Sequence, residues 1–466
     1  MTAEPVALPR VAGQEPRVAV LVYNHAAHDS RVLKTAVSLR AAGAQVSIFA
    51  VARSRAGYPP GPGVVGDGVP VRRAPEFELA RSAPALLRLA RLVTGRRAQP
   101  ELADAPSATP PAPWPVPSTG PAPGPPPAPG IVQDLWLRAY RTLSLALYWW
   151  HAFRSAASYR PHVVHACDGN TLAPAMALSA VTGAKVVYDS HELWLRRNVR
   201  PDRPVAPWVE AAIEWAGVRW ADGVITVSPS IATWLRRRYR LPVEPALVRN
   251  APLTAARVHR GGVEDEGEAE APVSLRDRAG LGADAQVVAY AGRMTTARGL
   301  EETLAALALL PSRVHLVLLG YGEPDYLATL HAHAAELGLQ RRIHVVAAVQ
   351  PGDVPAVLST ADVSVVIVRP VCLSYRFSLP NKVFESIHAG VPVVAADLPD
   401  LASLVRRYGV GEVVDVSSPS RLAEVIAAVL ERPEPYRRAA ASASHEISWA
   451  GEARRLLGLY SRVLGP

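Results

Sequence analysis

Cysteine is scarce in this chain of 466 residues, and long apolar runs are absent from it. Cys167 and Cys372 lie far apart and match neither a metal-binding nor a redox spacing, so we expect two reduced, partly buried thiols. No stretch reaches the roughly 20 apolar residues that span a bilayer, and residues 1–16 lack the apolar segment of a signal peptide. These absences predict a cytoplasmic protein, either soluble or peripheral on the inner face of the membrane.

Two further absences bear on function. The chain has no zinc-finger spacing and no basic run interleaved with aromatic residues, which disfavours nucleic acid as a partner. No Gly-x-Gly-x-x-Gly follows the first predicted strand, which disfavours a dinucleotide-dependent dehydrogenase. The chain does have a basic excess, because 50 Lys and Arg against 41 Asp and Glu give a formal net charge of +9. This excess favours anionic partners such as phosphates or acidic lipids, without choosing among them.

Three segments interrupt the rest of the chain. Residues 1–16 are typical of a flexible tail, and residues 103–130 are dominated by Pro, Ala and Gly, which predicts a disordered or polyproline-like insertion. The acidic residues between 261 and 271 indicate a surface loop. The length of the chain and its hydrophobic content of 49% leave room for two large α/β domains.

Short runs of Val, Ile and Leu alternate with longer helical patterns over most of the sequence. Such apolar strands, separated by helices, are typical of parallel sheets covered on both faces. We predict strands at residues 17–23, 45–51, 162–165, 184–188, 223–227, 287–291, 314–319, 343–346, 363–368 and 391–395. The two series predict two doubly wound, Rossmann-like domains, at 17–250 and 286–445, joined by a linker and acidic loop at 251–285.

Ligands of open parallel sheets bind beyond the carboxyl ends of the strands, so functional residues are expected there. Gly292 and Arg293 directly follow one predicted strand, and Arg298 precedes a predicted helix. Cations beside a helix N-terminus suit a diphosphate, although single surface arginines are also common. Gly320 follows the next strand, where either close approach to a ligand or an ordinary turn explains it.

A second group of candidates surrounds Pro380. A proline in the first turn of a helix leaves the N–H groups of the following residues free to meet a ligand, and Lys382 adds positive charge. Glu385, one turn further on, can accept the two hydroxyls of a ribose, or it can simply complement the helix dipole. Ser378 and Asn381 join Lys382 as candidate ligand-binding residues at this helix start.

In the first half of the chain a polar quartet follows the strand at 184–188. His191 can bind an oxygen of a sugar or a phosphate, with Asp189 or Glu192 orienting it or adding contacts, and a purely structural histidine is the alternative. Asn24 and the residues 29–31 follow the first strand in the same way. They form either a loop facing the predicted cleft or the N-cap of the next helix.

Residues 133–157 are rich in Leu, Trp and Tyr and include several arginines. A helix of this composition can lie on an anionic membrane surface, or it can pack on the N-terminal domain. The sequence leaves both alternatives open.

Taken in order, these motifs resemble glycosyltransferase family four, a group of retaining enzymes with the GT-B fold. The resemblance covers nearly the whole chain outside the three interrupting segments, and it points to a branch with a Pro-Asn-Lys-x-Phe-Glu motif. It rests on DSRVLK at 29–34, YDSHEL at 188–193, ADGVITVS at 221–228, RNAP at 249–252 and LPNKVFE at 379–385. Residues 446–466 resemble the last helix of the family, which crosses back to the N-terminal domain.

The resemblance implies a hexosyltransferase-type enzyme that needs neither a metal nor a cofactor, and the high content of Ala, Arg and Pro is typical of a GC-rich bacterial genome. It would move a sugar from a nucleoside-diphosphate sugar to a glycan, a lipid-linked or a small-molecule acceptor. Arg293 and Arg298 would bind the pyrophosphate, and Glu385 would bind the ribose. His191 would reach the sugar from the first domain, which would hold the acceptor. The cations and the helix N-termini would neutralise the leaving diphosphate.

The chain departs from the family pattern at two positions. Arg298 stands where the family usually has a lysine, so a planar fork replaces a point charge. Many members also carry a glutamate near the donor sugar at the position of Phe377, although the branch resembled here often lacks it. Sugar contacts would then come from backbone N–H groups and from neighbours such as Ser374. A nucleotide-sugar epimerase of the same fold and a catalytically silent binding protein are the alternative functions.

Overall fold

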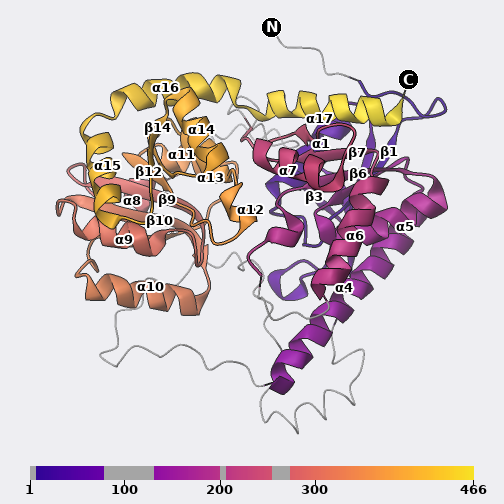
Figure 1. The fold of residues 1–466 in the computed structure, drawn as a ribbon, viewed down its shortest axis with the longest axis horizontal. Coiled ribbons are helices and arrows are strands. Elements are labelled where there is room, and N and C mark those ends of the chain that lie inside the picture. The colour runs from indigo at the N-terminus through magenta and orange to yellow at the C-terminus, as the bar shows by residue number, and fades with distance from the viewer. Residues whose placement is uncertain (1–6, 78–130, 200–205, 254–272, 466) are drawn as a thin grey trace, which may run out of the picture.

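The structure, a computed structural model, describes residues 7–77, 131–199, 206–253 and 273–465. Two lobes lie side by side, each a sheet flanked by helices, and the last helix runs from one lobe onto the other (Figure 1). The predicted Pro-rich insertion at 103–130 and the acidic stretch at 261–271 lie outside the described residues.

The described strands of the N-terminal domain form an eight-stranded sheet in the order β3-β4-β2-β1-β5-β6-β7-β8. Neighbouring strands are parallel except for the β3–β4 hairpin, so the carboxyl ends of the central strands lie at one edge. The strands are β1 (Arg17–Leu21), β2 (Gln45–Val51), β3 (Gly61–Val65), β4 (Val69–Ala74), β5 (Val163–Cys167), β6 (Lys185–Ser190), β7 (Gly223–Thr226) and β8 (Ala246–Leu247).

The described C-terminal domain holds a six-stranded, all-parallel sheet in the order β11-β10-β9-β12-β13-β14. Its strands are β9 (Gln286–Met294), β10 (Val314–Gly322), β11 (Ile343–Ala347), β12 (Val363–Val366), β13 (Val393–Ala396) and β14 (Gly411–Val414). Every strand predicted from the sequence is present, and the prediction of two doubly wound parallel sheets is confirmed.

Helices cover both sheets. The N-terminal domain has α1 (Ser30–Ala41), η1 (Ser54–Ala56), α4 (Ile131–Tyr159), η2 (Gly169–Thr171), α5 (Leu172–Thr182), η3 (Trp194–Arg196), α6 (Ala206–Trp220) and α7 (Pro229–Tyr239). The C-terminal domain has α8 (Leu275–Arg278), α9 (Leu300–Ala308), α10 (Pro324–Glu336), α11 (Val354–Leu358), α12 (Leu373–Arg376), α13 (Asn381–His388), α14 (Pro399–Tyr408), α15 (Pro419–Glu431) and α16 (Glu434–Glu446), and α17 (Trp449–Leu464) follows.

Strand β1 shows why the apolar runs form central strands. Val18 and Val20 are fully buried in the hydrophobic core on one face of the sheet, while Ala19 and Leu21 are buried in the core on the other face. Side chains alternate between the two faces of a strand, so a strand covered on both faces must be apolar throughout. At the end of β1 the side chain of Asp29 accepts a hydrogen bond from the N–H of Val32 and caps α1.

Two segments differ from the predicted domain boundaries. Residues 7–16, predicted as part of a flexible tail, are bound to the N-terminal domain: Leu8 is buried in its core, and the N–H of Leu8 donates to the carbonyl of Ala42 at 2.9 Å. Helix α8, which falls inside the predicted linker, belongs to the C-terminal domain because Leu275 is buried in that domain's core. In both cases a buried leucine helps to fix a segment that the sequence assigned to a tail or a linker.

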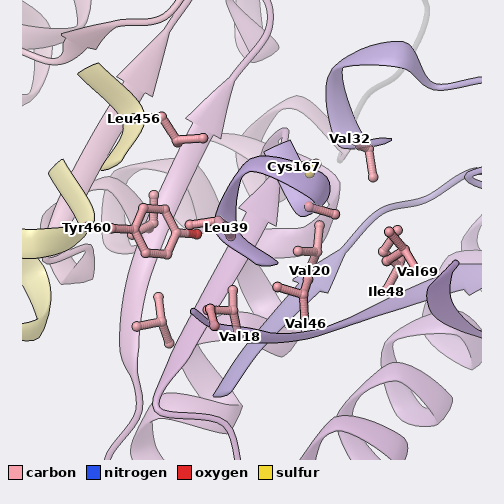
Figure 2. Close-up of a cluster of buried hydrophobic side chains, with 14 of the residues drawn as sticks. Val18, Val20, Val32, Leu39, Val46, Ile48, Val69, Cys167, Leu456 and Tyr460 are labelled. Atoms are coloured by element: carbon pink, nitrogen blue, oxygen red, sulfur yellow. The ribbon is translucent and has the colours of Figure 1, made fainter. Parts of the chain in front are cut away.

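Helix α17 lies on the N-terminal domain although it follows the C-terminal one (Figure 1). Leu456 and Tyr460 from α17 share one core with Val18 and Leu39 (Figure 2). Strand β7 approaches α17 closely, since a Cβ added at Gly223 would lie 3.1 Å from side-chain atoms of the helix. The helix is thus packed into the N-terminal core over much of its length.

Helix α4 is long, and its two halves differ in their surroundings. Tyr148, Ala152 and Ala156 are buried against the N-terminal sheet and α5. The first half of the helix projects beyond the sheet (Figure 1). Packing on the N-terminal domain, one of the two alternatives for this helix, therefore accounts for its second half. No helix among the described residues is both long and apolar enough to cross a membrane.

Candidate functional site

The two domains touch at the edges where their central strands end. The hydroxyl of Ser228, just after β7, donates to the carbonyl of Phe377 at 2.7 Å. In the first turn of α7, the N–H and the hydroxyl of Ser230 both donate to the carboxylate of Asp400 at 2.9 Å. These contacts fix α7 against α12 and α14 and bring the polar residues of both domains toward one boundary.

His191 lies at the carboxyl end of β6, between two carboxylates. Its backbone N–H donates to Asp168 Oδ1 at 3.0 Å, and its Nδ1 is 3.3 Å from Asp168 Oδ2. Its Nε2 is 3.2 Å from Asp189 Oδ2, a contact by distance that lacks the angle of a good hydrogen bond. Burial lowers the pKa of His191, but Asp168 and Asp189 together raise it well above the ordinary value. The two carboxylates therefore favour the cationic imidazole.

Asp189 is enclosed behind His191 rather than open to a ligand. It is 1% exposed, and Arg31 of α1 holds it through two bonds, from Nε to Oδ2 at 2.9 Å and from Nη2 to Oδ1 at 2.6 Å. Burial raises the pKa of Asp189, but Arg31 and then His191 bring it well below its usual range. Asp189 is placed to orient His191, which is one of the two roles that the sequence left open.

Asp168 is a site residue that the sequence analysis missed. It follows β5 directly, so the rule that located His191 at a strand's carboxyl end also applies to it. Its backbone has φ +61° and ψ 169°, a combination that an aspartate rarely adopts and that functional sites often retain. Glu192 lies in the same group: burial and Asp168 raise its pKa to about 7, while Arg197, His191 and then Arg298 from the other domain lower it. The two domains thus face each other at Glu192 and Arg298.

In the C-terminal domain Gly292 makes room for Lys382. Gly292 follows the run of five buried residues in β9 and has φ +121°, and a Cβ there would lie 3.1 Å from the Nζ of Lys382. The ammonium group lies 4.7 Å from the centre of the Tyr290 ring. Burial, followed by the nearby charge of Arg298, lowers the pKa of Lys382 to about 7. Gly320 lies beside Gly292 in the sheet, and a Cβ there would be 2.1 Å from the Gly292 carbonyl oxygen, so only glycine fits.

The two predicted phosphate-binding arginines differ in their surroundings. Arg298 is half-buried, its guanidinium lies 4.8 Å from the centre of the Tyr375 ring, and its charge acts on Lys382. Arg293 is exposed and forms an ion pair with Glu323, which caps α10. The structure therefore brings Arg298 and Lys382 together, whereas Arg293 would have to leave Glu323 to join them.

Glu385 lies one turn after Lys382 on α13 and is half-buried. Burial raises its pKa, while Lys382 and then Lys34 lower it. Lys34 comes from α1 of the N-terminal domain, where its Nζ donates to the carbonyl of Ala251 at 2.6 Å. The pKa of Glu385 is thus lowered by one cation from each domain.

The remaining candidates lie around the start of α13. Asn381 is the exposed first residue of the helix. The hydroxyl of Ser378 donates to the carbonyl of Tyr375 at 2.8 Å, which leaves its oxygen able to accept. Phe377 packs against the N-terminal core, so the position where many members of the resembled family carry a glutamate serves here in contacts between the domains. Among the described residues no group of three or more His, Cys, Asp and Glu could hold a metal ion.

Comparisons with known proteins show which proteins this chain resembles. A family model described as "Glycosyl transferases group 1" matches residues 274–446, and one described as "Glycosyltransferase Family 4" matches residues 116–250. The D-inositol 3-phosphate glycosyltransferase of Xylanimonas cellulosilytica is 31% identical over 42% of this chain and 47% of its own length. The alpha-D-kanosaminyltransferase of Streptomyces kanamyceticus is 26% identical over 64% of this chain and 77% of its own. The chain spans about half the length of several curated relatives that it matches.

Solved structures show the fold. Sucrose-phosphate synthase from Thermosynechococcus elongatus superposes with a TM-score of 0.66 at 18% identity, covering 96% of this chain and 99% of that one. HepE of Anabaena in complex with UDP-glucose superposes with a TM-score of 0.60 at 16% identity, covering 94% and 98%. The chain has the two-domain GT-B fold. Both halves of the chain thus resemble glycosyltransferases, one through each family model.

Proposed function

We propose that the protein is a retaining, metal-independent glycosyltransferase that takes a sugar from a nucleoside-diphosphate sugar. The observation that carries this proposal is the convergence of Arg298, Lys382 and Glu385 on one domain opposite the cationic His191 on the other. Two cations beside the start of α13 suit a diphosphate, and a carboxylate one turn away suits a pair of ribose hydroxyls. The acceptor, a glycan or a lipid-linked or small molecule, would bind on the N-terminal domain of a cytoplasmic enzyme that needs no cofactor.

The proposed chemistry follows from these charges. As the bond between the sugar and the diphosphate breaks, negative charge develops on the leaving phosphate, and preorganised cations stabilise that charge. Arg298 and Lys382 would supply this stabilisation, and Arg293 would add to it after leaving Glu323. His191, held by Asp168 and Asp189, would donate an N–H to an oxygen of the donor sugar or phosphate. Because the pKa of Lys382 is about 7, binding a diphosphate at neutral pH would favour its charged form.

A panel of donors tests the proposal. The purified protein is mixed with UDP-glucose, UDP-N-acetylglucosamine, GDP-mannose, dTDP-glucose and ADP-glucose, and its melting temperature and the release of nucleotide are followed. A donor at a hundred times its Kd stabilises the folded state by about 2.7 kcal/mol, which raises Tm by several degrees. If none of these donors stabilises the protein or releases nucleotide, the silent binding protein becomes the better reading. An altered sugar still attached to its nucleotide would instead favour the epimerase.

Replacement of Glu385 by alanine is expected to weaken donor binding by roughly tenfold to a hundredfold. A charge-assisted hydrogen bond is worth about 1.5–3 kcal/mol, and its loss acts directly on Kd. Calorimetric titration with the stabilising donor and with the free nucleoside diphosphate measures the effect. Glu424→Ala removes an exposed carboxylate of α15 paired with Arg421, and it serves as the matched control. Equal Kd values for the two variants would show that the ribose lies elsewhere.

A further inference from the structure

Tyr460, on the returning helix α17, points its hydroxyl at a buried histidine. The Tyr460 side chain is fully buried, and its hydroxyl oxygen is 2.9 Å from Nδ1 of His165 on β5. The two rings lie nearly parallel, with centroids 6.2 Å apart. Figure 2 shows Tyr460 within the core of the N-terminal domain, to which α17 brings it from far along the chain.

The other ring nitrogen of His165 faces Asp189. It is 1% exposed, and its Nε2 lies 3.3 Å from Asp189 Oδ2. A neutral imidazole has one N–H and one lone pair, so the nitrogen that faces a carboxylate carries the proton. Nδ1 is then the acceptor, and the O–H of Tyr460 is the donor that it needs. Tyr460 therefore fixes both the tautomer and the orientation of the His165 ring.

Oδ2 of Asp189 connects the Tyr460–His165 pair to the candidate site. The same oxygen accepts from Nε of Arg31 at 2.9 Å, lies 3.3 Å from His165 and lies 3.2 Å from Nε2 of His191. Arg31 is a permanent cation, whereas the hydrogen bond from His165 depends on its ring position and tautomer. A change at His165 thus alters the electron density that Asp189 offers to His191.

The helix that carries Tyr460 also binds the connection between the domains. Glu452, 1% exposed on α17, accepts from the backbone N–H of Arg249 at 3.0 Å and pairs with its guanidinium at 2.6 Å. The N–H of Trp449, at the start of the same helix, donates to the carbonyl of Pro252 at 3.0 Å. Helix α17 therefore contacts the segment that leads to the donor domain and also carries Tyr460, the residue of this series that lies farthest from His191.

We propose that Tyr460 is a positioning residue that, through His165 and Asp189, sets the orientation and charge of His191. The proposal rests on the proposed function only in giving His191 a role in sugar transfer. The series of contacts runs Tyr460, His165, Asp189, His191; the first three side chains are buried and His191 is partly buried. Tyr460 touches neither donor nor acceptor, so its removal acts on the rate of the chemical step and leaves donor affinity unchanged.

The first test is spectroscopic and needs no ligand. The full-length protein is labelled with ¹⁵N-histidine, and the imidazole ¹⁵N resonances of His165 and His191 are assigned with His165→Gln and His191→Gln variants. Tyr460→Phe is expected to shift the resonances of both histidines. Tyr148→Phe is the matched control, because Tyr148 is also fully buried in this domain and gives its hydroxyl to the Phe49 carbonyl at 3.3 Å, outside the network. Unchanged His191 resonances in Tyr460→Phe would overturn the proposal.

The second test is kinetic. With UDP-glucose, or another donor of the panel that is turned over, Tyr460→Phe is expected to lower kcat by roughly fivefold to tenfold, as expected for one lost hydrogen bond, with KM for the donor unchanged within about twofold. In a His165→Leu background the same substitution is expected to have no further effect, since leucine offers the Tyr460 hydroxyl no acceptor. Equal losses in both backgrounds, or the same loss in Tyr148→Phe, would indicate a purely structural role. If the wild type turns over no donor, the proposed function fails while the spectroscopic test still decides this one.

Discussion

Replacing His191 by alanine is expected to lower kcat by roughly a hundredfold to a thousandfold, the size of effect seen when one preorganised donor to a developing charge is removed. Asp168 contacts both the backbone N–H and Nδ1 of His191, and Asp189 lies 3.2 Å from Nε2, so the side chain is oriented before any ligand binds. Its raised pKa keeps the cation present below that pKa and removes it as the pH rises through it. The wild type should therefore lose activity on the alkaline side, and this limb should be missing from the residual activity of the variant.

Nucleotide release from the stabilising donor, measured across pH, gives both quantities. His333→Ala is the control, because it removes an exposed histidine of α10 that pairs only with Glu336 of its own helix. A His191→Ala enzyme with the control's kcat and an unchanged alkaline limb would rule out a role for His191 at the reacting sugar. Glu192, whose pKa is about 7, would then be the next titrating group to replace.

The fold could be predicted where burial requires a continuous apolar sequence. Central strands such as β1 and β9 are apolar on both faces and stand out as continuous runs. The hairpin of β3 and β4 was missed because it lies at the sheet edge, where Gly61-Pro62-Gly63 and Pro70 are tolerated and resemble a turn. Strand β8 has two residues, too few for any pattern.

The candidate site was predictable where a strand ends and hidden where distant segments pair. Glu385 and His191 were proposed as site residues from their local position, and both remain predictions. The partner of Asp189 was not found, because Arg31 is 158 residues away in sequence and hydrogen-bond geometry leaves no local signal. The pairing of Arg293 with Glu323 and the packing of Phe377 on the other domain are likewise products of tertiary structure. Only a structure can tell which of several strand-end charges face a ligand.

The Arg31–Asp189 pair leads to the largest expected loss of stability. Asp189→Asn is expected to destabilise the N-terminal domain by about 3–5 kcal/mol, because it leaves the Arg31 guanidinium, whose side chain is 5% exposed, without its counter-charge. The corresponding fall in Tm is roughly 10 °C. The pKa of Asp189 is well below the ordinary 3.8, so the pair's contribution is fully present above that value and is lost as the pH falls below it. The difference between wild type and variant should therefore be constant near neutrality and shrink only in acid.

Thermal and urea unfolding, followed by tryptophan fluorescence between pH 3 and pH 8, measure this difference. Asp397→Asn is the matched control, since its partner Arg406 is 3.3 Å away and both side chains are more than half exposed. Exposed pairs contribute at most about 1 kcal/mol, so this variant should unfold close to the wild type. An equally small effect for Asp189→Asn would mean that water or another group compensates Arg31. In that case Asp189 would not be the rigid support that holds His191 toward the donor domain.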